Sequence, residues 1–380
     1  MKTLSRYFIS LRGFVLQWHI TERCNWRCRH CYREKEYIKE LPLNKLFEIF
    51  LQYIDLIKAL RIPKGHAHLN IAGGEPFIRD DFFQFLELIH KHNKGRLKVG
   101  LLSNGSLITR KNAFTLKSLG VEKIQLSLEG MQETNDSIRG NGAFDKITGV
   151  AKILIDVGIL TDISLTLIRQ NITDLPSVVQ LCDSLGIHRL GIRRFVPIGR
   201  GKQEQLGILN PKEQRRIYHW RKKTQFELKA KNSGLHLTTG CEDGIFTNSL
   251  QHRASCAVID GRGLTLFPNG DVLACRRLPI KVGNALQKSL LEIYFSSDKL
   301  WWLRNLSNAH SLCQGCSNFK FCHGGAPCIT YAYFGRFSAP DPQCWRVFTD
   351  LPSSKLLKGQ EEKTSPYIKT VYVPFIKNKN

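Results

Sequence analysis

The chain has 380 residues, with 56 Lys and Arg against 32 Asp and Glu, for a formal net charge of +24. A chain of this length can bury one large core and a smaller second one. Its positive charge favours an acidic partner, for which nucleic acid, an acidic peptide and an acidic electron-transfer protein are candidates. No apolar run is long enough to span a bilayer, no signal peptide is evident, and the 12 Cys favour a reducing compartment, so we expect a cytoplasmic protein with no membrane partner.

Strand-like segments alternate with amphipathic helical segments over the first half of the chain. We expect strands at 14–20, 67–72, 97–103, 123–128, 160–168 and 187–196, with helices between them that include 44–60 and 80–92, the second capped by Asp80 and Asp81. Six strand–helix units in succession predict a parallel α/β sheet with right-handed crossovers. Ligands of such sheets gather at the carboxyl ends of the strands, where we expect the site.

Three cysteines follow the first expected strand at C-x3-C-x2-C spacing, namely Cys24, Cys28 and Cys31. A cubane iron–sulfur cluster normally takes one thiolate on each of its four irons, so three thiolates leave one iron open to a ligand that is not protein. The alternatives are a Cys3His zinc site that uses His30 and three unconnected core cysteines.

This loop resembles the signature of the radical S-adenosylmethionine (SAM) superfamily. The resemblance implies a partial (β/α)6 barrel over residues 14–205, after a short segment 1–13. It also implies a [4Fe–4S] cluster whose open iron is chelated by SAM, and reductive cleavage of SAM to methionine and a 5′-deoxyadenosyl radical. His30 then lies near the adenine, as does segment 195–201.

Short polar motifs follow the second, third and fourth expected strands. They are Gly73, Gly74, Glu75 and Pro76, then Ser103 and Asn104, then Ser127 and Glu129. By the resemblance, Glu75 holds the SAM amino group, Glu129 accepts from the ribose, and Arg139 is directed at the SAM carboxylate. Turn capping is the alternative role of the Ser and Asn residues.

A basic helix is expected at 211–231, within a bridging segment 206–240. Asn210 is a candidate N-cap, Pro211 occupies the first turn, and Glu213 could close a capping box. Its densest positive charge comes from Arg215, Arg216, Arg221, Lys222 and Lys223. This face is either simply solvated or a docking surface for an acidic partner.

A second cysteine set lies between residues 241 and 350, before a basic tail at 351–380 with a strand-like patch at 367–376. Its order resembles the SPASM domain, a C-terminal extension that carries two auxiliary [4Fe–4S] clusters. The resemblance assigns an outer cluster to Cys313, Cys316, Cys322 and Cys344, and an inner cluster to Cys256, Cys275 and Cys328, with Cys241 as a candidate eighth ligand. Five residues separate Cys322 from Cys328, where the family usually has three, and C-x2-C pairs also serve zinc.

The SPASM resemblance implies substrates that are usually peptides modified after translation. Arg276 follows Cys275 where sulfatase-maturing relatives have Asp, which disfavours that chemistry. We therefore expect a maturase of a ribosomally made peptide that forms a cross-link or oxidises a side chain. A peptide epimerase and a tetrapyrrole-modifying enzyme are the close alternatives.

The expected partners are the precursor peptide and an acidic electron donor such as flavodoxin or ferredoxin. Too few residues precede Phe14 for a fused leader-binding domain, so a leader would dock either on the basic surface or on a separate leader-binding protein. A zinc-bearing nucleic-acid-binding protein is an alternative of another class. Core periodicity of the aromatic residues weighs against it, since base stacking needs exposed rings among basic residues.

Overall fold

The computed structural model describes residues 11, 13–33, 38–203, 207–240, 245, 256–305, 313, 315–337 and 339–348. Cys241, the tail at 351–380 and its strand-like patch lie outside the described residues. No helix among the described residues is both long and apolar enough to cross a membrane.

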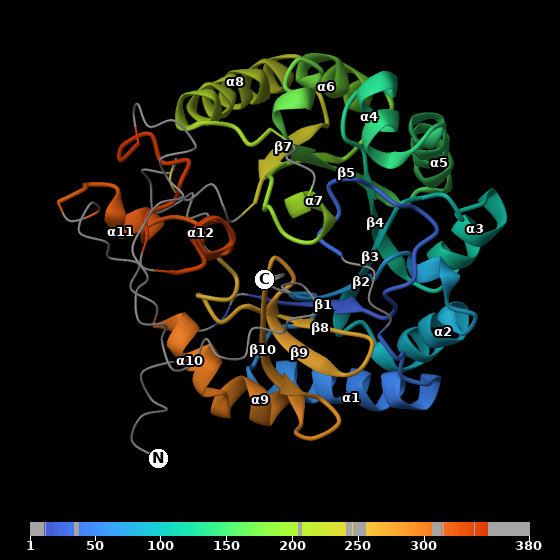
Figure 1. The fold of residues 1–380 in the computed structure, drawn as a ribbon. Coiled ribbons are helices and arrows are strands. Elements are labelled where there is room, and N and C mark those ends of the chain that lie inside the picture. Colours follow the sequence, from blue (N-terminus) through green and yellow to red (C-terminus); the bar gives the residue numbers. More distant parts are fainter. Residues whose placement is uncertain are drawn as a thin grey trace.

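One curved sheet organises the described chain (Figure 1). Its ten strands run in the order β10-β9-β8-β1-β2-β3-β4-β5-β6-β7. Neighbours from β8 to β7 are parallel, whereas β8, β9 and β10 pair antiparallel. The bounds are β1 Phe14–His19, β2 Ala67–Ala72, β3 Leu97–Ser103, β4 Val121–Ser127, β5 Leu160–Leu167, β6 Arg189–Arg194, β7 His236–Thr239, β8 Gly263–Leu266, β9 Asp271–Cys275 and β10 Leu278–Asn284.

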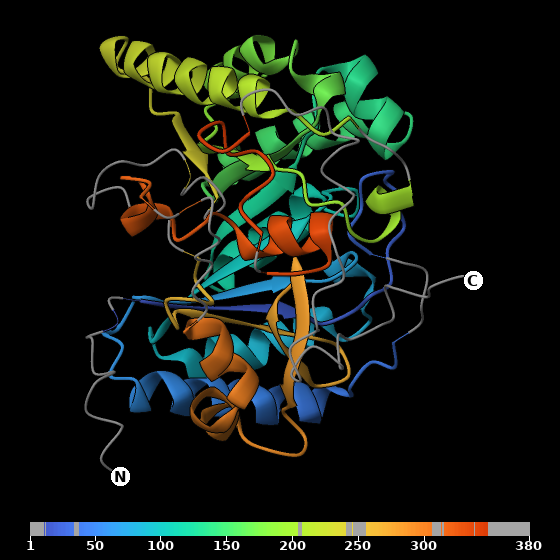
Figure 2. The same cartoon turned by 60° about the vertical axis from the view of Figure 1, so that its left-hand side comes forward.

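Helices α1 to α6 and α8 surround the outer face of the sheet, and α11 and α12 lie at the side that they leave open (Figures 1 and 2). The first group is α1 Leu43–Ala59, α2 Phe82–Asn93, α3 Arg110–Ser118, α4 Gln132–Arg139, α5 Ala143–Val157, α6 Leu175–Ser184 and α8 Pro211–Ala230. The others are α7 Arg200–Gln203, α9 Leu290–Ser296, α10 Asp298–Arg304, α11 Phe319–Cys322 and α12 Pro327–Phe334, with short 3-10 turns η2 Pro76–Ile78 and η3 Arg169–Asn171.

The core lies between the sheet and its outer helices because alternate strand residues are apolar. In β1, Phe14, Leu16 and Trp18 are fully buried, and the Trp18 ring meets the Phe85 ring of α2 edge-on at 5.2 Å. Residues of the opposite register, such as Gln17 and its β2 neighbour Asn70, are only half-buried. A closed eight-stranded barrel fills its interior with branched apolar side chains. Here the concave face stays polar and partly exposed.

The expected six-strand α/β arrangement is confirmed, and every expected strand end lies within two residues of the observed one. Asn210 and Glu213 form the expected capping box at the start of α8, with both bonds at 2.8 Å. Asp81 occupies the N-cap position of α2 but makes no capping bond. Its carboxylate accepts from Arg79 instead.

The cysteine-rich segment begins inside this sheet. β8 pairs in parallel with β1, so residues 263–284 extend the barrel sheet rather than form a sheet of their own. Sequence periodicity could not show this, because β8 is only four residues long and its partner is distant in the chain. How far the C-terminal segment is a domain of its own stays a prediction.

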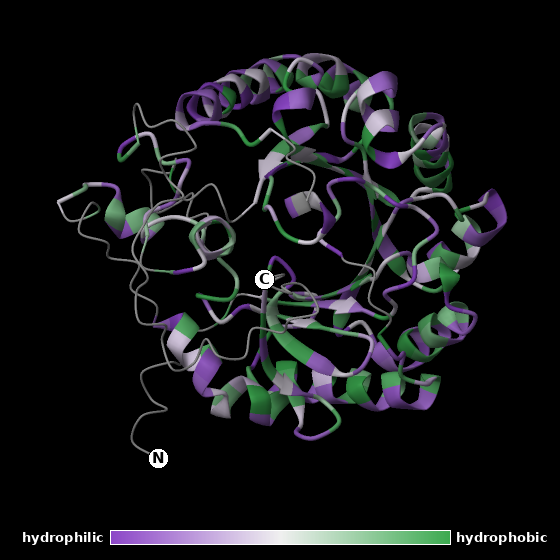
Figure 3. Cartoon of the chain, viewed as in Figure 1, coloured by the Kyte–Doolittle hydropathy of each residue, from purple (hydrophilic) through white to green (hydrophobic). Residues whose placement is uncertain are grey.

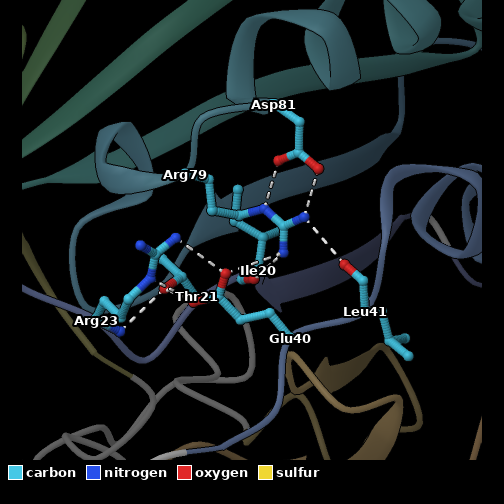
Figure 4. A network of polar contacts seen from close by, with 7 residues as sticks. All are labelled: Ile20, Thr21, Arg23, Glu40, Leu41, Arg79 and Asp81. Carbon is cyan, nitrogen blue, oxygen red and sulfur yellow. Dashed lines mark hydrogen bonds and ion pairs between the residues drawn. The ribbon is translucent and has the colours of Figure 1, made fainter.

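Arg79 fixes the chain where β1 leads into the cysteine loop (Figure 4). The guanidinium is 5% exposed. It donates to both oxygens of Asp81 at 2.8 and 2.7 Å, to Ile20 O at 2.9 Å and to Leu41 O at 3.0 Å. Glu40 adds a second layer by accepting from Arg23 Nε at 3.0 Å and from the Thr21 hydroxyl. The segment before α1 is thereby held against the start of the loop.

We expect Arg79→Met to lower the free energy of unfolding by about 3 kcal/mol, because methionine keeps the aliphatic volume but leaves the carbonyls of Ile20 and Leu41 without a donor. Urea unfolding measures the loss. Arg110→Met is the matched control, since Arg110 pairs with Asp156 on the surface and both are more than half exposed. Equal losses in the two variants would contradict this role of Arg79.

Candidate functional site

The three loop cysteines lie at the carboxyl end of β1, on a loop held from both sides of the barrel. Within the loop, Cys31 N donates to Cys28 O at 3.3 Å. From beyond β6, Gly201 N donates to Cys31 O at 3.2 Å and Arg200 Nε donates to Cys28 O at 3.2 Å. Segment 195–201, expected near the adenine, therefore contacts the cysteine loop itself.

The sulfur atoms of this loop face hydrogen-bond donors. Cys24 Sγ accepts from Trp26 N at 3.5 Å and from Asn104 Nδ2 at 3.8 Å, and Cys28 Sγ accepts from Arg139 Nη1 at 3.6 Å. Burial raises the pKa of both thiols, and at Cys28 the Arg139 charge opposes that rise. Donors and a cation aimed at sulfur stabilise thiolates bound to iron, so the surroundings fit an anionic cluster.

Two glycines let the β2 turn approach this loop at backbone distance. Gly74 N donates to Thr21 O at 2.9 Å, and Glu75 N donates to Arg23 O at 2.8 Å. A Cβ on Gly73 would collide with Thr21 O, and one on Gly74 with Arg23 O. The absence of a Cβ at both positions therefore lets the cysteine loop approach the β2 turn at backbone distance.

The side chain of Glu75 points into the interior, where its carboxylate accepts hydrogen bonds from three neighbouring residues. It is fully buried and accepts from the Ser103 hydroxyl at 2.9 and 3.0 Å, from Asn104 N at 2.8 Å and from Phe77 N at 3.4 Å. Burial raises the pKa of Glu75 to about 7, and these hydrogen bonds oppose the rise. Ser103 and Asn104, predicted at the site, thus lie in contact with Glu75, and Pro76 opens η2 directly after it.

Glu129 joins two other predicted residues at the end of β4. His30 Nε2 lies 3.0 Å from its Oε1, Arg139 donates to the same oxygen, and Thr166 N donates to Oε2 at 2.6 Å. Burial alone would raise the pKa of Glu129, but His30 and Arg139 lower it to about 2. Both carboxylate oxygens are therefore occupied, so in this geometry Glu129 orients His30 and Arg139. Its predicted bond to a ribose stays a prediction, as does the role of Ser127, which is half-buried at the end of β4.

His30 Nδ1 and Arg139 Nε are buried and make no hydrogen bond to the described residues. Buried polar atoms of this kind are normally satisfied, so both are suited to a bound polar group. His30 lies on the cysteine loop and contacts Glu129, and Arg139 contacts both Cys28 and Glu129. These positions fit SAM, for which both residues were predicted from the sequence.

A buried charge cluster missed by sequence reasoning ties the β9–β10 turn to the cysteine loop. Glu22 accepts from Arg33 Nε at 3.0 Å and from Arg276 Nη2 at 3.2 Å. The Arg276 guanidinium also lies over the Tyr32 ring at 4.3 Å and the Phe267 ring at 4.6 Å. In the sequence, Arg276 served only as evidence against sulfatase maturation. In the structure, its side chain packs directly on the cysteine loop. Glu22 and Arg33 stand on either side of the three cysteines in the sequence, and this pair of opposite charges is the signal that could have indicated the cluster.

The four cysteines of the outer set lie around one small hollow. Cys313, Cys316, Cys322 and Cys344 line it together with Asn318, Asp341 and Arg346. Asp341 is fully buried and forms a bidentate pair with Arg194 at the end of β6, at 3.0 and 2.6 Å. The outer set is therefore fastened to the barrel rim by an ion pair that the sequence did not suggest.

The inner set is less fully described. Cys256, Cys275 and Cys328 all adjoin the main apolar core, Cys275 at the end of β9 and Cys328 in α12. Their joint ligation of a cluster, with or without Cys241, stays a prediction. No group of three or more His, Cys, Asp or Glu among the described residues is arranged to hold a single metal ion.

A curved parallel sheet with three thiols on the first loop, and a four-cysteine hollow at its rim, define an iron–sulfur enzyme of the partial-barrel class. Residues 18–182 match the radical SAM superfamily, and residues 256–317 match SPASM, an iron–sulfur cluster-binding domain. The chain belongs to the radical SAM superfamily and carries a SPASM domain. The predicted fold class and enzyme class are confirmed, and so are the predicted [4Fe–4S], SAM and auxiliary iron–sulfur cofactors. The zinc alternatives lose their support.

The chain resembles curated enzymes that are named for different products. The chain is 25% identical to the AdoMet-dependent heme synthase of Methanosarcina barkeri, over 87% of this chain and 95% of that protein. It is 29% identical to the mycofactocin maturase MftC of Mycolicibacterium smegmatis, over 87% of this chain and 82% of that protein.

Solved structures share the fold. SuiB of Streptococcus suis bound to SAM superposes with a TM-score of 0.72 at 20% identity, over 90% of this chain and 80% of that one. The enzyme anSMEcpe bound to AdoMet gives 0.69 at 18%, over 87% and 94%.

When bound, SAM and its cluster supply a 5′-deoxyadenosyl radical for hydrogen-atom abstraction. The protein supplies the geometry. Cys24, Cys28 and Cys31 would hold three irons, Glu75 would accept from the SAM amino group, and Arg139 and His30 would be steered by Glu129 toward the rest of the cofactor. Backbone contacts around the loop fix these groups before SAM arrives.

We expect the protein without SAM to lose stability as pH rises from about 4.5 to 7, by at most about 3 kcal/mol, because folded Glu75 keeps a proton that the unfolded chain releases. Glu75→Gln should remove this dependence, so that the variant is the more stable protein at pH 8 and not at pH 5. Urea unfolding at the two pH values tests the stabilities. Equal pH dependence in both proteins would show that Glu75 is not the titrating group. The same variant should bind SAM more weakly.

We expect Cys313→Ala combined with Cys316→Ala to lower bound iron by about one cluster, or about four irons per chain. Dithionite-driven formation of 5′-deoxyadenosine should persist, because the loop cysteines are untouched. Iron and sulfide analysis after anaerobic reconstitution measures the loss. Cys182→Ala is the control, since Cys182 is buried in α6 among core residues. Iron content equal to wild type in the double variant would disprove the outer ligand set.

Proposed function

We propose that this enzyme is a peptide maturase. It abstracts a hydrogen atom from a ribosomally synthesised peptide and forms a cross-link or oxidises a side chain, with peptide epimerisation as the close variant. The observation that carries the proposal is a polar concave face, left partly exposed beside the cysteine loop, in a chain that resembles MftC over most of both lengths. A face not filled by the protein's own side chains can admit a segment of another chain.

A group of cationic side chains surrounds Asp162 near the amino ends of β4, β5 and β6. Lys123 of β4 and Arg189 of β6 both pair with Asp162 of β5, the first at 3.5 Å. Burial lowers the pKa of Lys123, and the positive charges of Arg189 and Arg193 lower it further. Asp162 is thus shared by Lys123, His188 and Arg189 in the amino-terminal half of the strands, away from the cysteine loop, so this cluster does not bear on the substrate.

The second candidate is a tetrapyrrole-modifying enzyme. The specific observation that favours it is the likeness to the heme synthase over 95% of that protein's length. A carboxylated tetrapyrrole and an acidic peptide are both anionic, so the net charge of the chain does not separate the two substrates. The partners of the proposed maturase are the precursor peptide, an acidic electron donor and a separate leader-binding protein, in a reducing compartment.

The anaerobically reconstituted enzyme should modify a precursor peptide encoded beside its gene, in the presence of SAM and dithionite. Mass spectrometry distinguishes the outcomes, since a cross-link removes two hydrogen atoms, whereas epimerisation leaves the mass unchanged and introduces deuterium from heavy water. Iron-coproporphyrin is tested in parallel, and loss of carboxyl groups from it alone would favour the second candidate.

The control for this experiment replaces Cys24, Cys28 and Cys31 together by Ala. It should form no 5′-deoxyadenosine and no product while still binding auxiliary iron. Modified peptide from this variant would refute the radical mechanism.

A further inference from the structure

The middle of α8 lies against the outer cysteine set. Tyr218 of α8 packs with Ile245, and Cys322 and Trp345 pack against the same small cluster. Trp345 directly follows Cys344, and its neighbour Arg346 lines the hollow between the four cysteines. Figures 1 and 2 both show the red segment after α12 running beside α8. The helix that the sequence left as either solvated or functional therefore borders the outer cluster site.

Four cations surround the two aromatic rings at this border. The guanidinium groups of Arg346 and Arg215 lie 4.4 and 5.5 Å from the centre of the Trp345 ring. Lys222 Nζ and the Arg221 guanidinium lie 4.9 and 5.5 Å from the centre of the Tyr218 ring. We name Arg215, Tyr218, Arg221, Lys222, Trp345 and Arg346 the Trp345 patch.

Three acidic side chains among the described residues of this region pair with cations outside the patch. Glu213 accepts from Arg169 at 3.1 and 3.0 Å, Glu227 lies 3.7 Å from Lys223, and Asp341 is buried against Arg194. Arg215, Lys222 and Arg346 are exposed. Figure 3 shows more purple on α8 than on α5, another helix on the outer face of the sheet.

We propose that the Trp345 patch is the docking surface of an acidic electron-transfer protein that carries a flavin or an iron–sulfur cluster. The donor is oxidised by one electron, and the cluster held by Cys313, Cys316, Cys322 and Cys344 is reduced by that electron. This inference deepens the proposed function by giving its electron donor a docking site. Of the earlier assignments, it rests only on that of the four outer cysteines as ligands of one cluster.

The chemistry of the patch favours this partner over mere solvation. Electron-transfer encounters are small and steered by charge, and a ring of exposed cations provides that steering. Arg and aromatic side chains are enriched in the centres of protein interfaces. The patch also adjoins a cluster ligand, so a partner seated there is brought next to the cofactor it must reduce.

The test uses the anaerobically reconstituted holoenzyme and an acidic flavodoxin as probe, at low and at physiological ionic strength. Arg215→Glu with Lys222→Glu should weaken flavodoxin binding at least tenfold at low salt and flatten its salt dependence, since screening acts on the lost charge pairs. Stopped-flow reduction of the clusters by reduced flavodoxin should slow in the variant, whereas reduction by dithionite should not change.

The matched control is Lys229→Glu with Lys231→Glu, which reverses the same number of exposed charges at the far end of α8, about 16 Å along the helix from Tyr218. This control should bind flavodoxin as wild type does. A second variant, Arg215→Gln with Lys222→Gln, removes charge without adding repulsion and should show an intermediate loss.

Affinity and salt dependence equal to wild type in both patch variants would overturn the proposal. So would an unchanged affinity for flavodoxin combined with weaker binding of the acidic precursor peptide, because the patch would then belong to the peptide. Failure of the proposed function looks different, since the wild-type enzyme would then modify no peptide even with dithionite while the flavodoxin results stand.

Discussion

The approach of the β2 turn to the cysteine loop is the contact on which the rest of the site depends. Two backbone hydrogen bonds, from Gly74 to Thr21 and from Glu75 to Arg23, continue the β1–β2 pairing beyond the strands. Only glycine at positions 73 and 74 leaves room for them. They set Glu75 beside the loop that carries Cys24, and Glu75 in turn fixes Ser103 and Asn104 at the end of the next strand. The same backbone contacts therefore position both the cysteine loop and the residues predicted to bind SAM.

Two buried ion pairs extend this order to the cysteine-rich segment. Arg276 reaches Glu22 at the β1 side of the barrel, and Arg194 reaches Asp341 at the β6 side. Removing one partner of such a pair leaves an uncompensated buried charge, which costs several kcal/mol. The two ion pairs thus hold the outer cysteine set and the β9–β10 turn against the barrel. Any other arrangement would leave a buried charge without its partner.

Local signals in the sequence predicted the parts of the molecule that depend on local pattern. The alternation around Phe14 predicted β1, and the cysteine spacing and the motif at Gly73 predicted residues that the structure brings close together. Contacts between distant segments could not be read in the same way. Three such contacts are the sharing of Glu129 by His30 and Arg139, the pairing of β8 with β1, and the packing of Trp345 near α8. They join residues that are far apart in the chain, so no periodic pattern in the sequence indicates them.

The distribution of buried charge explains how cofactor and protein complete each other. Arg33 and Arg276 share the single carboxylate of Glu22, and Arg139 faces both Glu129 and the sulfur of Cys28. Burial raises the pKa of the Cys24 and Cys28 thiols, and that of Cys344 to about 11, so without iron these thiols are neutral at neutral pH. Cluster assembly must then release protons and place negative charge beside the buried cations. The anionic cluster supplies the countercharge that the carboxylates do not, and iron binding therefore stabilises the loop that binds it.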